Sequence, residues 1–516
     1  MRGGQIWCWW ARSAVEVDLS DIERVSLIVN RPQIPDSTVP NATPPSANAN
    51  AQRGIAGTVR GRLIRGFGAT ALSPVVTAIV QVVSVPVFLH VWGAKLYGEW
   101  LIISAIPTYL ALSDVGFGGV AGNDMTMRVA AGDRDGALET YQSTRVLMSI
   151  TSLLGGIALL GIIWLLPLTR WLNLSSMAIS EARITLSLLS VYALVSLQAG
   201  LYLVGFRCDG NYGFGVLVDN LIRLSEFVAA MIAVVLSGRP AAVAGVLLVA
   251  RILGTTVMGW LMLRKSPWLR HGIDRVRMDS VRQLALPAVA YMAFPTGSAL
   301  SLQGLVVVIG MVLGPVAVAT FSAMRTLTRF ALQITEIIRL GVWPELSAAY
   351  GAKNWNLARR LHRTACQASL WLSILAVGFL LIAGGRILTV WSHGRIVMDV
   401  SAFRWLLLVI IANAFWNTSS VATMASNKHQ RIAAAYFAAT AVATVVAYFL
   451  LQRFGLSGAA MALLIVDITV GWFVVKSSLA ELDEGLRQFL GALFRVSDGL
   501  QLLWGTRRFV RLWAGE

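Results

Sequence analysis

The sequence predicts an all-α membrane protein with twelve transmembrane helices, arranged as two six-helix lobes related by a pseudo-two-fold axis along the membrane normal. The first reason is composition: hydrophobic residues make up 56%, charged residues only 13%, and the mean hydropathy is +0.67. A chain this apolar is expected to have many membrane spans rather than one large soluble core. The second reason is the recurrence of apolar runs long enough to cross a bilayer. The third is a similarity between the two halves of the chain.

Twelve apolar runs are predicted to span the membrane, and prolines inside several of them suggest kinks. Their ranges are 67–92, 100–121, 146–166, 184–206, 217–236, 241–263, 284–313, 316–344, 365–387, 403–424, 432–451 and 456–475. The predicted organisation is a disordered cytoplasmic tail at 1–60, a first lobe at 61–264, a basic loop at 265–282, a second lobe at 283–476 and a tail at 477–516. The last segment is amphipathic, which predicts a helix on the cytoplasmic leaflet beside anionic headgroups. Its apolar and basic residues are Leu482, Leu486, Phe489, Leu490, Leu493, Arg507, Arg508 and Arg511.

The distribution of basic residues sets the predicted orientation. Arginines and lysines crowd the segment before the first span, the middle loop and the loop after the eighth span, whereas the alternate loops hold few. Both termini and the middle loop are therefore predicted to be cytoplasmic. The net charge is +17, but the basic residues alternate with apolar runs along the chain, which is not the pattern of a nucleic-acid groove. The three cysteines are far apart and indicate no disulfide framework.

Short motifs relate the two halves. Gly93 and Tyr97 before the second span match Gly314 and Val318 before the eighth, with Trp100 opposite Phe321. A glycine then follows each span, which pairs Gly132 with Gly351. Because each half has six helices, an even number, the second half repeats the first in the same orientation, and a cavity is expected between them.

The eighth predicted span carries an unusual row of charges. Arg325, Arg329, Glu336 and Arg339 lie within about 40° of one another on one helix face, over roughly 20 Å. Three arginines facing lipid would cost on the order of 8–10 kcal/mol. We therefore predict that they line a wet cavity that attracts anions. The alternative is a buried network in which Glu336 bridges two arginines, although one carboxylate does not neutralise three cations.

Further charges lie inside other spans. Asp219, Arg223 and Glu226 share one face of the fifth span, where a self-satisfied pair and a cavity role are both open. Arg251 in the sixth span has no partner nearby in sequence. Asp467 in the twelfth span is expected to pair with an arginine of the other half, whereas Asp114 in the second could pair or carry a proton.

Enzymatic functions have little support in the sequence. The stretch from Asp133 to Asp135 is similar to the acidic metal-binding pair of sugar-nucleotide transferases. The corresponding positions of the second half include Asn354, and both segments are typical of helix starts, where Asp and Asn serve as caps. We predict no catalytic residues, no metal and no cofactor.

Three stretches carry a resemblance to a known family. They are 93–100 (GAKLYGEW), 112–118 (LSDVGFG) and 131–136 (AGDRDG), and they resemble the bacterial O-antigen and exopolysaccharide flippases of the multidrug/oligosaccharidyl-lipid/polysaccharide exporter superfamily. The resemblance covers roughly residues 67–475. It implies two six-helix lobes that alternate between inward-open and outward-open states, and an undecaprenyl-pyrophosphate-linked glycan as cargo. Some family members have a cation in the seventh span, which this chain lacks from 283 to 311.

The predicted function is therefore the flipping of a lipid-linked oligosaccharide for cell-surface polysaccharide synthesis. The proposed headgroup cations are Arg325, Arg329 and Arg339, helped by Arg251 and Arg223. Glu336 and Glu226 would be their counterions, and Asp114 and Asp467 candidates for coupling. Predicted partners are the anionic glycan lipid, membrane lipids and polysaccharide polymerase or export machinery, and no nucleic acid. The alternatives are an ion-coupled multidrug antiporter of the same superfamily and a membrane-embedded glycosyltransferase or polymerase.

Overall fold

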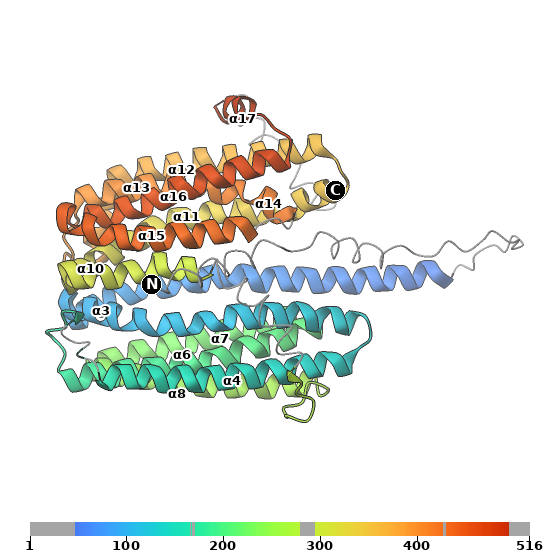
Figure 1. Ribbon diagram of the computed structural model, residues 1–516, viewed down its shortest axis with the longest axis horizontal. Helices are drawn as coiled ribbons and strands as arrows, with labels where there is room; N and C mark the ends of the chain where they lie inside the picture. The colour runs from blue at the N-terminus through green and yellow to red at the C-terminus, as the bar shows by residue number, and fades with distance from the viewer. Residues whose placement is uncertain (1–46, 166, 168–170, 279–294, 427–429, 495–516) are drawn as a thin grey trace, which may run out of the picture. The chain divides into compact units, whose positions relative to one another are not determined.

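A computed structural model describes residues 47–165, 167, 171–278, 295–426 and 430–494, and these residues contain helices and no strand (Figure 1). The chain divides into two compact units, 1–59 and 60–516, and the second carries the fold described below, except for residues 47–59 at the start of α3. Its helices are α3 (Ala47–Ala130), α4 (Arg134–Leu165), α6 (Ile179–Cys208), α7 (Tyr212–Ser237), α8 (Pro240–Lys265), the π-helical turn η1 (Leu300–Gly304), α10 (Leu305–Leu313), α11 (Pro315–Gly351), α12 (Trp355–Trp391), α13 (Val400–Ser419), α14 (Val421–Ala425), α15 (Gln430–Phe454), α16 (Leu456–Glu481) and α17 (Leu486–Leu493).

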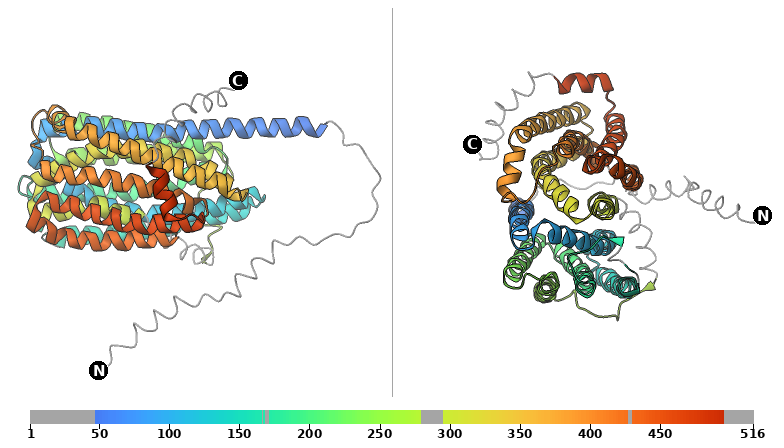
Figure 2. Two further views of the ribbon diagram at one scale, coloured as in Figure 1. Left: turned by 90° about the horizontal axis from the view of Figure 1, so that it is seen from above. Right: turned by 90° about the vertical axis from the view of Figure 1, so that its left-hand side faces the viewer.

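The helices of this unit form two bundles, which Figures 1 and 2 show as separate groups. The N-lobe holds α3, α4, α6, α7 and α8, and the C-lobe holds η1 and α10 to α17. In the N-lobe α6 packs on α4 and α8, and α7 packs on α8. In the C-lobe α13 packs in the same way on α12 and α16, and α15 packs on α16. The same packing order in both lobes agrees with the repeat predicted from the sequence.

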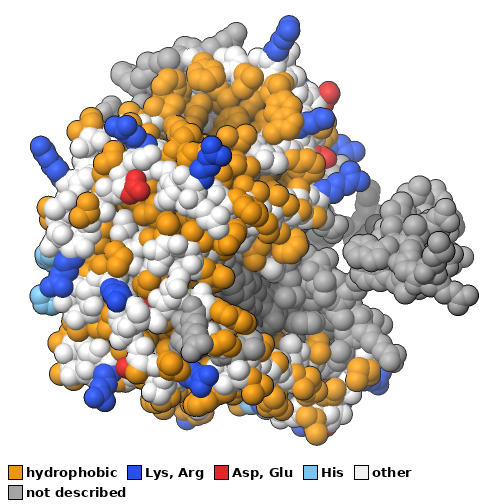
Figure 3. Space-filling view, turned by 60° about the vertical axis from the view of Figure 1, so that its left-hand side comes forward, with side chains coloured by type: hydrophobic (Ala, Val, Ile, Leu, Met, Phe, Trp, Pro, Cys, Tyr) orange, Lys and Arg blue, Asp and Glu red, His pale blue; other side chains and the backbone are white. Residues whose placement is uncertain are grey.

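Ten helices of the described residues are long and apolar enough to cross a membrane. The long helix α3 counts once among them, although it contains the first two predicted spans on either side of a break at Gly93. The charged helix α11 is not among the ten. Each predicted span thus falls on a helix, with 284–294 outside the described residues, and the chain is a multi-pass membrane protein. Large hydrophobic side chains are exposed on the outside of the bundles, where a soluble protein would be polar (Figure 3).

Two glycines make equivalent turns in the two lobes. Gly93 has φ 68° and ψ 175°, and Gly314 has φ 83° and ψ 178°. Side chains with a Cβ are strained in this region, so both turns require glycine. Gly98 shows how closely the lobes approach, because a Cβ there would lie 1.8 Å from the carbonyl oxygen of Pro315. The end of the bundles at Gly93 and Gly314 is called the junction end below.

The turns that follow α3 and α11 show that one predicted pairing of residues between the lobes is wrong. The Asp133 N–H donates to the Arg128 carbonyl and the Asn354 N–H donates to the Ala349 carbonyl, both at 2.9 Å. Asp133 therefore corresponds to Asn354, and the pairing of Gly132 with Gly351 is wrong by two residues. The reason is that Lys353 takes the left-handed conformation that Gly132 takes in the first lobe. Both Asp133 and Asn354 cap the helix that follows, as predicted: their side-chain oxygens accept backbone N–H groups at 2.8 and 3.2 Å.

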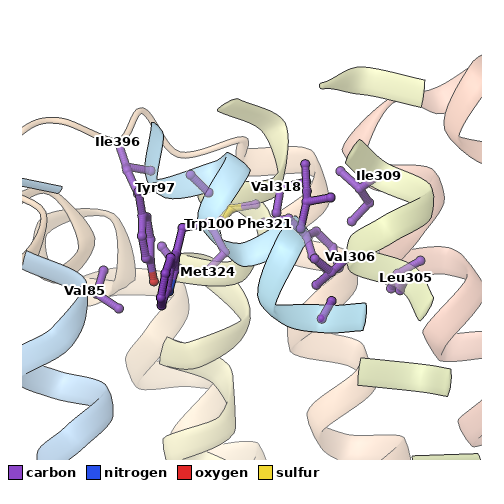
Figure 4. Packing of buried hydrophobic residues seen from close by; sticks show 14 of the residues in the cluster. Val85, Tyr97, Trp100, Leu305, Val306, Ile309, Val318, Phe321, Met324 and Ile396 are labelled. Carbon is purple, nitrogen blue, oxygen red and sulfur yellow. The ribbon is translucent and has the colours of Figure 1, made fainter. Parts of the chain in front are cut away.

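Both lobes contribute to one hydrophobic cluster at the junction end (Figure 4). The labelled side chains come from α3 (Val85, Tyr97 and Trp100), from α10 (Leu305, Val306 and Ile309), from α11 (Val318, Phe321 and Met324) and from the loop after α12 (Ile396). Trp100 and Phe321, which the sequence comparison set opposite each other, are both buried here. Each large side chain contributes about 1.5–3 kcal/mol when removed from water. The lobes are thus packed together at this end.

The segments that follow α8 and α16 each lie against their own lobe. Gln142 on α4 bonds to the loop after α8, accepting the Arg275 N–H at 2.8 Å and donating to Asp274 at 3.1 Å. In the C-lobe, Phe489 and Leu493 of α17 are buried against α12 and its neighbours, while Leu486 and Leu490 are exposed. Only one face of the predicted amphipathic helix is therefore free to meet a membrane. The arginines predicted to accompany it, Arg507, Arg508 and Arg511, lie outside the described residues.

Candidate functional site

A cavity of about 160 Å³ lies inside the C-lobe and contains the first two arginines of the charged helix. The lining comes from the segment around η1 and from α11, α13, α15 and α16. Its polar members are Ser298, Ser301, Arg325, Thr328, Arg329, Asn413, Tyr436 and Asp467. The sequence predicted a cavity between the lobes, but every lining residue of this one belongs to the C-lobe.

Arg325 is held by the π-helical turn. Its Nη1 donates to the Leu302 carbonyl at 3.2 Å and its Nη2 to the Ser301 carbonyl at 3.0 Å. A π-turn interrupts the regular hydrogen bonds of a helix, so its carbonyls can accept from a side chain, and such turns are frequent at functional sites. The guanidinium has five N–H donors, so this arrangement fixes its position and leaves donors for a ligand.

Arg329 lines the same cavity one turn further along α11. Among the described residues it makes no hydrogen bond and no ion pair. Its positive charge is therefore available inside the lobe, which is the property predicted for this face of the helix.

Asp467 is the cavity's carboxylate, with 6% of its surface exposed. Its Oδ1 accepts from Asn413 Nδ2 at 2.9 Å and from Trp416 Nε1 at 2.8 Å. The sequence led us to expect an arginine of the other lobe as its partner, whereas the partners in the structure are two neutral side chains of α13. With two arginines and one carboxylate, the ionised cavity has an excess of one positive charge.

Arg339 lies further along α11, outside the cavity lining. It forms a bidentate ion pair with Glu336, with Nε 2.7 Å from Oε2 and a second contact from Nη2 to Oε1. Asn417 Nδ2 also donates to Glu336, at 3.1 Å. The predicted row of charges thus separates into two arginines without a salt bridge among the described residues, Arg325 and Arg329, and one closed pair.

The N-lobe places its intramembrane charges differently. Arg251 and Glu226 are buried, with 8% and 4% of their surfaces exposed, and form an ion pair at 2.7 Å. The Tyr192 hydroxyl accepts from Arg251 at 2.8 Å and donates to Glu226 at 3.1 Å. Arg223 points away from this group: its side chain is 56% exposed and pairs with Asp219 at 2.8 Å. Sequence left Arg251 without a partner because Glu226 lies on another helix.

The remaining predicted site residue is Asp114, which lies in α3 at a position whose side chain is outside the described residues. The neutral members of both groups, Tyr192, Asn413, Trp416 and Tyr436, were missed by sequence reasoning. Asn and Trp are common in apolar helices, so the presence of these residue types does not by itself indicate a functional site. Among the described residues no cluster of three His, Cys, Asp or Glu side chains could hold a metal ion.

Solved structures share this fold. An inward-facing multidrug resistance MATE family transporter of the MOP superfamily is similar with a TM-score of 0.66 and 16% identity, over 79% of this chain and 98% of that one. The outward-facing conformation of such a transporter is similar with a TM-score of 0.56 and 15% identity, over 82% of this chain and 94% of that one. A third similar structure is a MOP superfamily transporter from Pyrococcus furiosus, described as having a binding pocket of reversed polarity. Its TM-score is 0.52 and its identity 14%, over 82% of this chain and 94% of that one. No family model and no curated protein matches the chain. The likeness shows that this chain has the same two-lobed helical fold as these proteins.

Proposed function

We propose that this multi-pass membrane protein moves an anionic lipid-linked glycan across the bacterial inner membrane by alternating access, and that Arg325 and Arg329 bind its pyrophosphate. The observation that carries the proposal is the excess positive charge of the C-lobe cavity. Arginine suits a pyrophosphate because its planar guanidinium is permanently charged and binds phosphate oxygens in pairs. In a site of low dielectric such bonds are stronger than in water. The fold, shared with transporters and not with enzymes, supports transport over glycan synthesis.

The size of the cavity limits what it holds. Pockets that enclose a drug-sized ligand occupy about 300–1,000 Å³, and this one has about 160 Å³. A charged headgroup fits that volume better than a whole glycan lipid does. We therefore assign the cavity to the headgroup, while the glycan and the polyprenyl chain would lie between the lobes and in the bilayer.

The other predicted residues take supporting roles in this proposal. Arg251 is already neutralised by Glu226, and Arg339 by Glu336, so neither offers free charge to the cargo. Arg223 is exposed and paired with Asp219. The proposed headgroup cations are thus reduced from five arginines to two.

A binding measurement on the purified protein in lipid nanodiscs tests this proposal. Arg325→Gln/Arg329→Gln should weaken the affinity for inorganic pyrophosphate roughly a hundredfold or more, because each charged hydrogen bond contributes about 1.5–3 kcal/mol. Arg404→Gln, which removes an exposed arginine on α13, is the matched control and should change the affinity little. Flipping of a fluorescent polyprenyl-pyrophosphate glycan in proteoliposomes should fall in parallel. Unchanged pyrophosphate affinity in a folded double variant would refute the proposal.

The second candidate is ion-coupled antiport of drugs, and the comparisons favour it because structures of the same fold are multidrug transporters. Asp467 would then be the carboxylate that binds a cation. The same variants separate the two functions. Under antiport, Asp467→Asn abolishes gradient-driven efflux of a cationic dye and Arg325→Gln/Arg329→Gln retains it. Under glycan flipping, the wild-type protein moves no cationic dye.

A further inference from the structure

The loops that follow α4 and α12 are equivalent in the two lobes. Asn173 lies two residues after Trp171, and His393 lies two residues after Trp391. Both take positive φ, 53° and 51°, which is uncommon for residues other than glycine. The repeat therefore includes the backbone of these loops, and both loops lie at the junction end.

Each loop donates a hydrogen bond to the opposite lobe. Asn173 Nδ2 donates to the carbonyls of Gly310 at 3.3 Å and Met311 at 2.8 Å, at the end of α10. Arg395 Nη1 donates to the carbonyl of Leu89 at 3.0 Å, before the break in α3. Leu89 and Gly310 are equivalent, since each lies four residues before its lobe's turn glycine. The acceptors Leu89 and Gly310 thus correspond, whereas the donors do not: Arg395 lies two residues beyond His393, the equivalent of Asn173.

The acceptors suit contacts that form and break. The Met311 carbonyl has no N–H partner in its own helix, because the residue four further on is Pro315, whereas the Gly310 carbonyl also accepts the Gly314 N–H at 3.1 Å. Water or a side chain can satisfy such a carbonyl. When the lobes part, water can replace both donors, so no polar group is left buried and unsatisfied. The hydrophobic cluster of Figure 4 includes Ile396, which follows Arg395 in the sequence, and Ile309, which precedes Gly310.

A buried carboxylate fixes the Asn173 loop before the bond forms. Glu99 is fully buried, and its oxygens accept the backbone N–H groups of Ser175 at 2.8 Å, Ser176 at 2.6 Å and Met177 at 3.0 Å. Glu99 stands in α3 just beyond the Gly93 turn, so it ties the loop to its own lobe. Asn173 is therefore held ready to bond whenever α10 approaches.

We propose that Asn173 and Arg395 form a latch, with one donor from each lobe, that holds the junction end closed and sets the balance between the two states of the transporter. This inference rests on the alternating-access part of the proposed function and is independent of the cargo. Each bond contributes only to the closed state, and a bond made in one state alone shifts the equilibrium by its full free energy. Loss of Asn173 or Arg395 thus favours the state open at the junction end.

Distances between spin labels test the latch without any cargo. The labels go on Leu236→Cys and Val397→Cys, in a Cys8→Ser background, because both side chains are highly exposed and lie at the junction end of different lobes. In nanodiscs the parent should give mainly the short distance. Asn173→Ala and Arg395→Met should each raise the ratio of long to short distances roughly tenfold, and the double variant roughly a hundredfold.

Two further variants separate the latch from a loss of folding. Arg395→Lys keeps a charged donor and should restore most of the short distance. Arg386→Met removes an exposed arginine on α12 and should leave the distribution unchanged. An unaltered distribution in the folded double variant, or an equal shift in Arg386→Met, overturns the latch. Since no cargo is present, that result leaves the pyrophosphate site untouched.

Discussion

The two lobes carry opposite charges at the same position of two equivalent helices, α8 and α16. Arg251 is the twelfth residue of α8 in the N-lobe, and Asp467 is the twelfth residue of α16 in the C-lobe, and both helices have 26 residues. Their partners are equivalent too: Tyr192 is the fourteenth residue of α6 and Asn413 the fourteenth of α13. One pair of positions thus carries a tyrosine and an arginine in one lobe, and an asparagine and an aspartate in the other.

The difference lies in what completes each group. In the N-lobe Glu226 neutralises Arg251 within a closed buried pair. In the C-lobe Asp467 has only neutral hydrogen-bond partners, and Arg325 and Arg329 bring two positive charges into the cavity. The same scaffold therefore carries a neutralised ion pair in one lobe and an excess of positive charge in the other. This comparison predicts that equivalent substitutions will act on different properties.

The largest expected effect is on the stability of the N-lobe. Arg251→Met leaves the charge of Glu226 buried without its ion-pair partner and should lower the free energy of unfolding by about 3–5 kcal/mol. Adding Glu226→Gln removes the stranded charge and should recover most of that loss. Arg329→Met in the C-lobe breaks no bond among the described residues and should cost far less. Unfolding of the three variants in mixed micelles measures this, and equal losses for Arg251→Met and Arg329→Met would contradict the assignment of the two lobes.

The next largest effect concerns a feature that the two lobes share, the glycine turns at Gly93 and Gly314. Gly93→Ala and Gly314→Ala each force a side chain into a backbone region of positive φ, at a cost of about 1–3 kcal/mol. Both variants should lose similar stability, because the turns have nearly the same angles. Gly341→Ala is the control: it lies inside α11 with open space around it, and alanine should stabilise the helix by about 0.5–1 kcal/mol. Thermal unfolding compares the three, and a cost in one lobe only would count against the repeat.

The fold was predictable because its signals are local. Apolar runs gave the spans, and Gly93 and Gly314 gave the repeat, since only glycine suits those turns. The site was predictable in part. Arg325 and Arg329 were identified because uncompensated charge in a membrane is costly wherever it lies. The partner of Arg251 was not, because Glu226 meets it through the packing of α7 on α8, which helical periodicity along one segment does not reveal.

A smaller effect concerns the charge of the C-lobe cavity. Asp467→Asn keeps the shape of the side chain and removes its negative charge. Pyrophosphate should then bind about fivefold more tightly, since a neighbouring charge in a partly hydrated site contributes on the order of 1 kcal/mol. Glu226→Gln in the N-lobe should leave this affinity nearly unchanged. Isothermal titration calorimetry measures the pyrophosphate affinity of both variants. Weaker binding by Asp467→Asn would contradict this prediction, because it would mean that the carboxylate helps to hold the ligand.

The smallest effect distinguishes the segments that follow α8 in the N-lobe and α16 in the C-lobe. His271, in the loop after α8, has a pKa below its usual value because it is partly buried and lies near Arg145. Its ring lies 3.1 Å from the Tyr141 hydroxyl, which attaches the loop to α4. The unfolded loop therefore binds a proton more readily than the docked loop. The docking is fully stable above the unfolded pKa of about 6.5 and weakens as pH falls from there through the folded pKa.

Hydrogen exchange of residues 266–278 between pH 7.5 and 5.5 measures this weakening, after correction for the intrinsic rate. Protection of the loop should decrease with pH in the parent and stay constant in His271→Gln, which cannot titrate. The segment around α17 in the C-lobe is followed in the same samples; it is attached by the Arg363–Glu484 pair and by Phe489, which stacks on the buried His362 of α12. His271→Gln should leave the protection of that segment unchanged at every pH. If the loop after α8 still lost protection in His271→Gln as the pH fell, the pH dependence would not belong to His271.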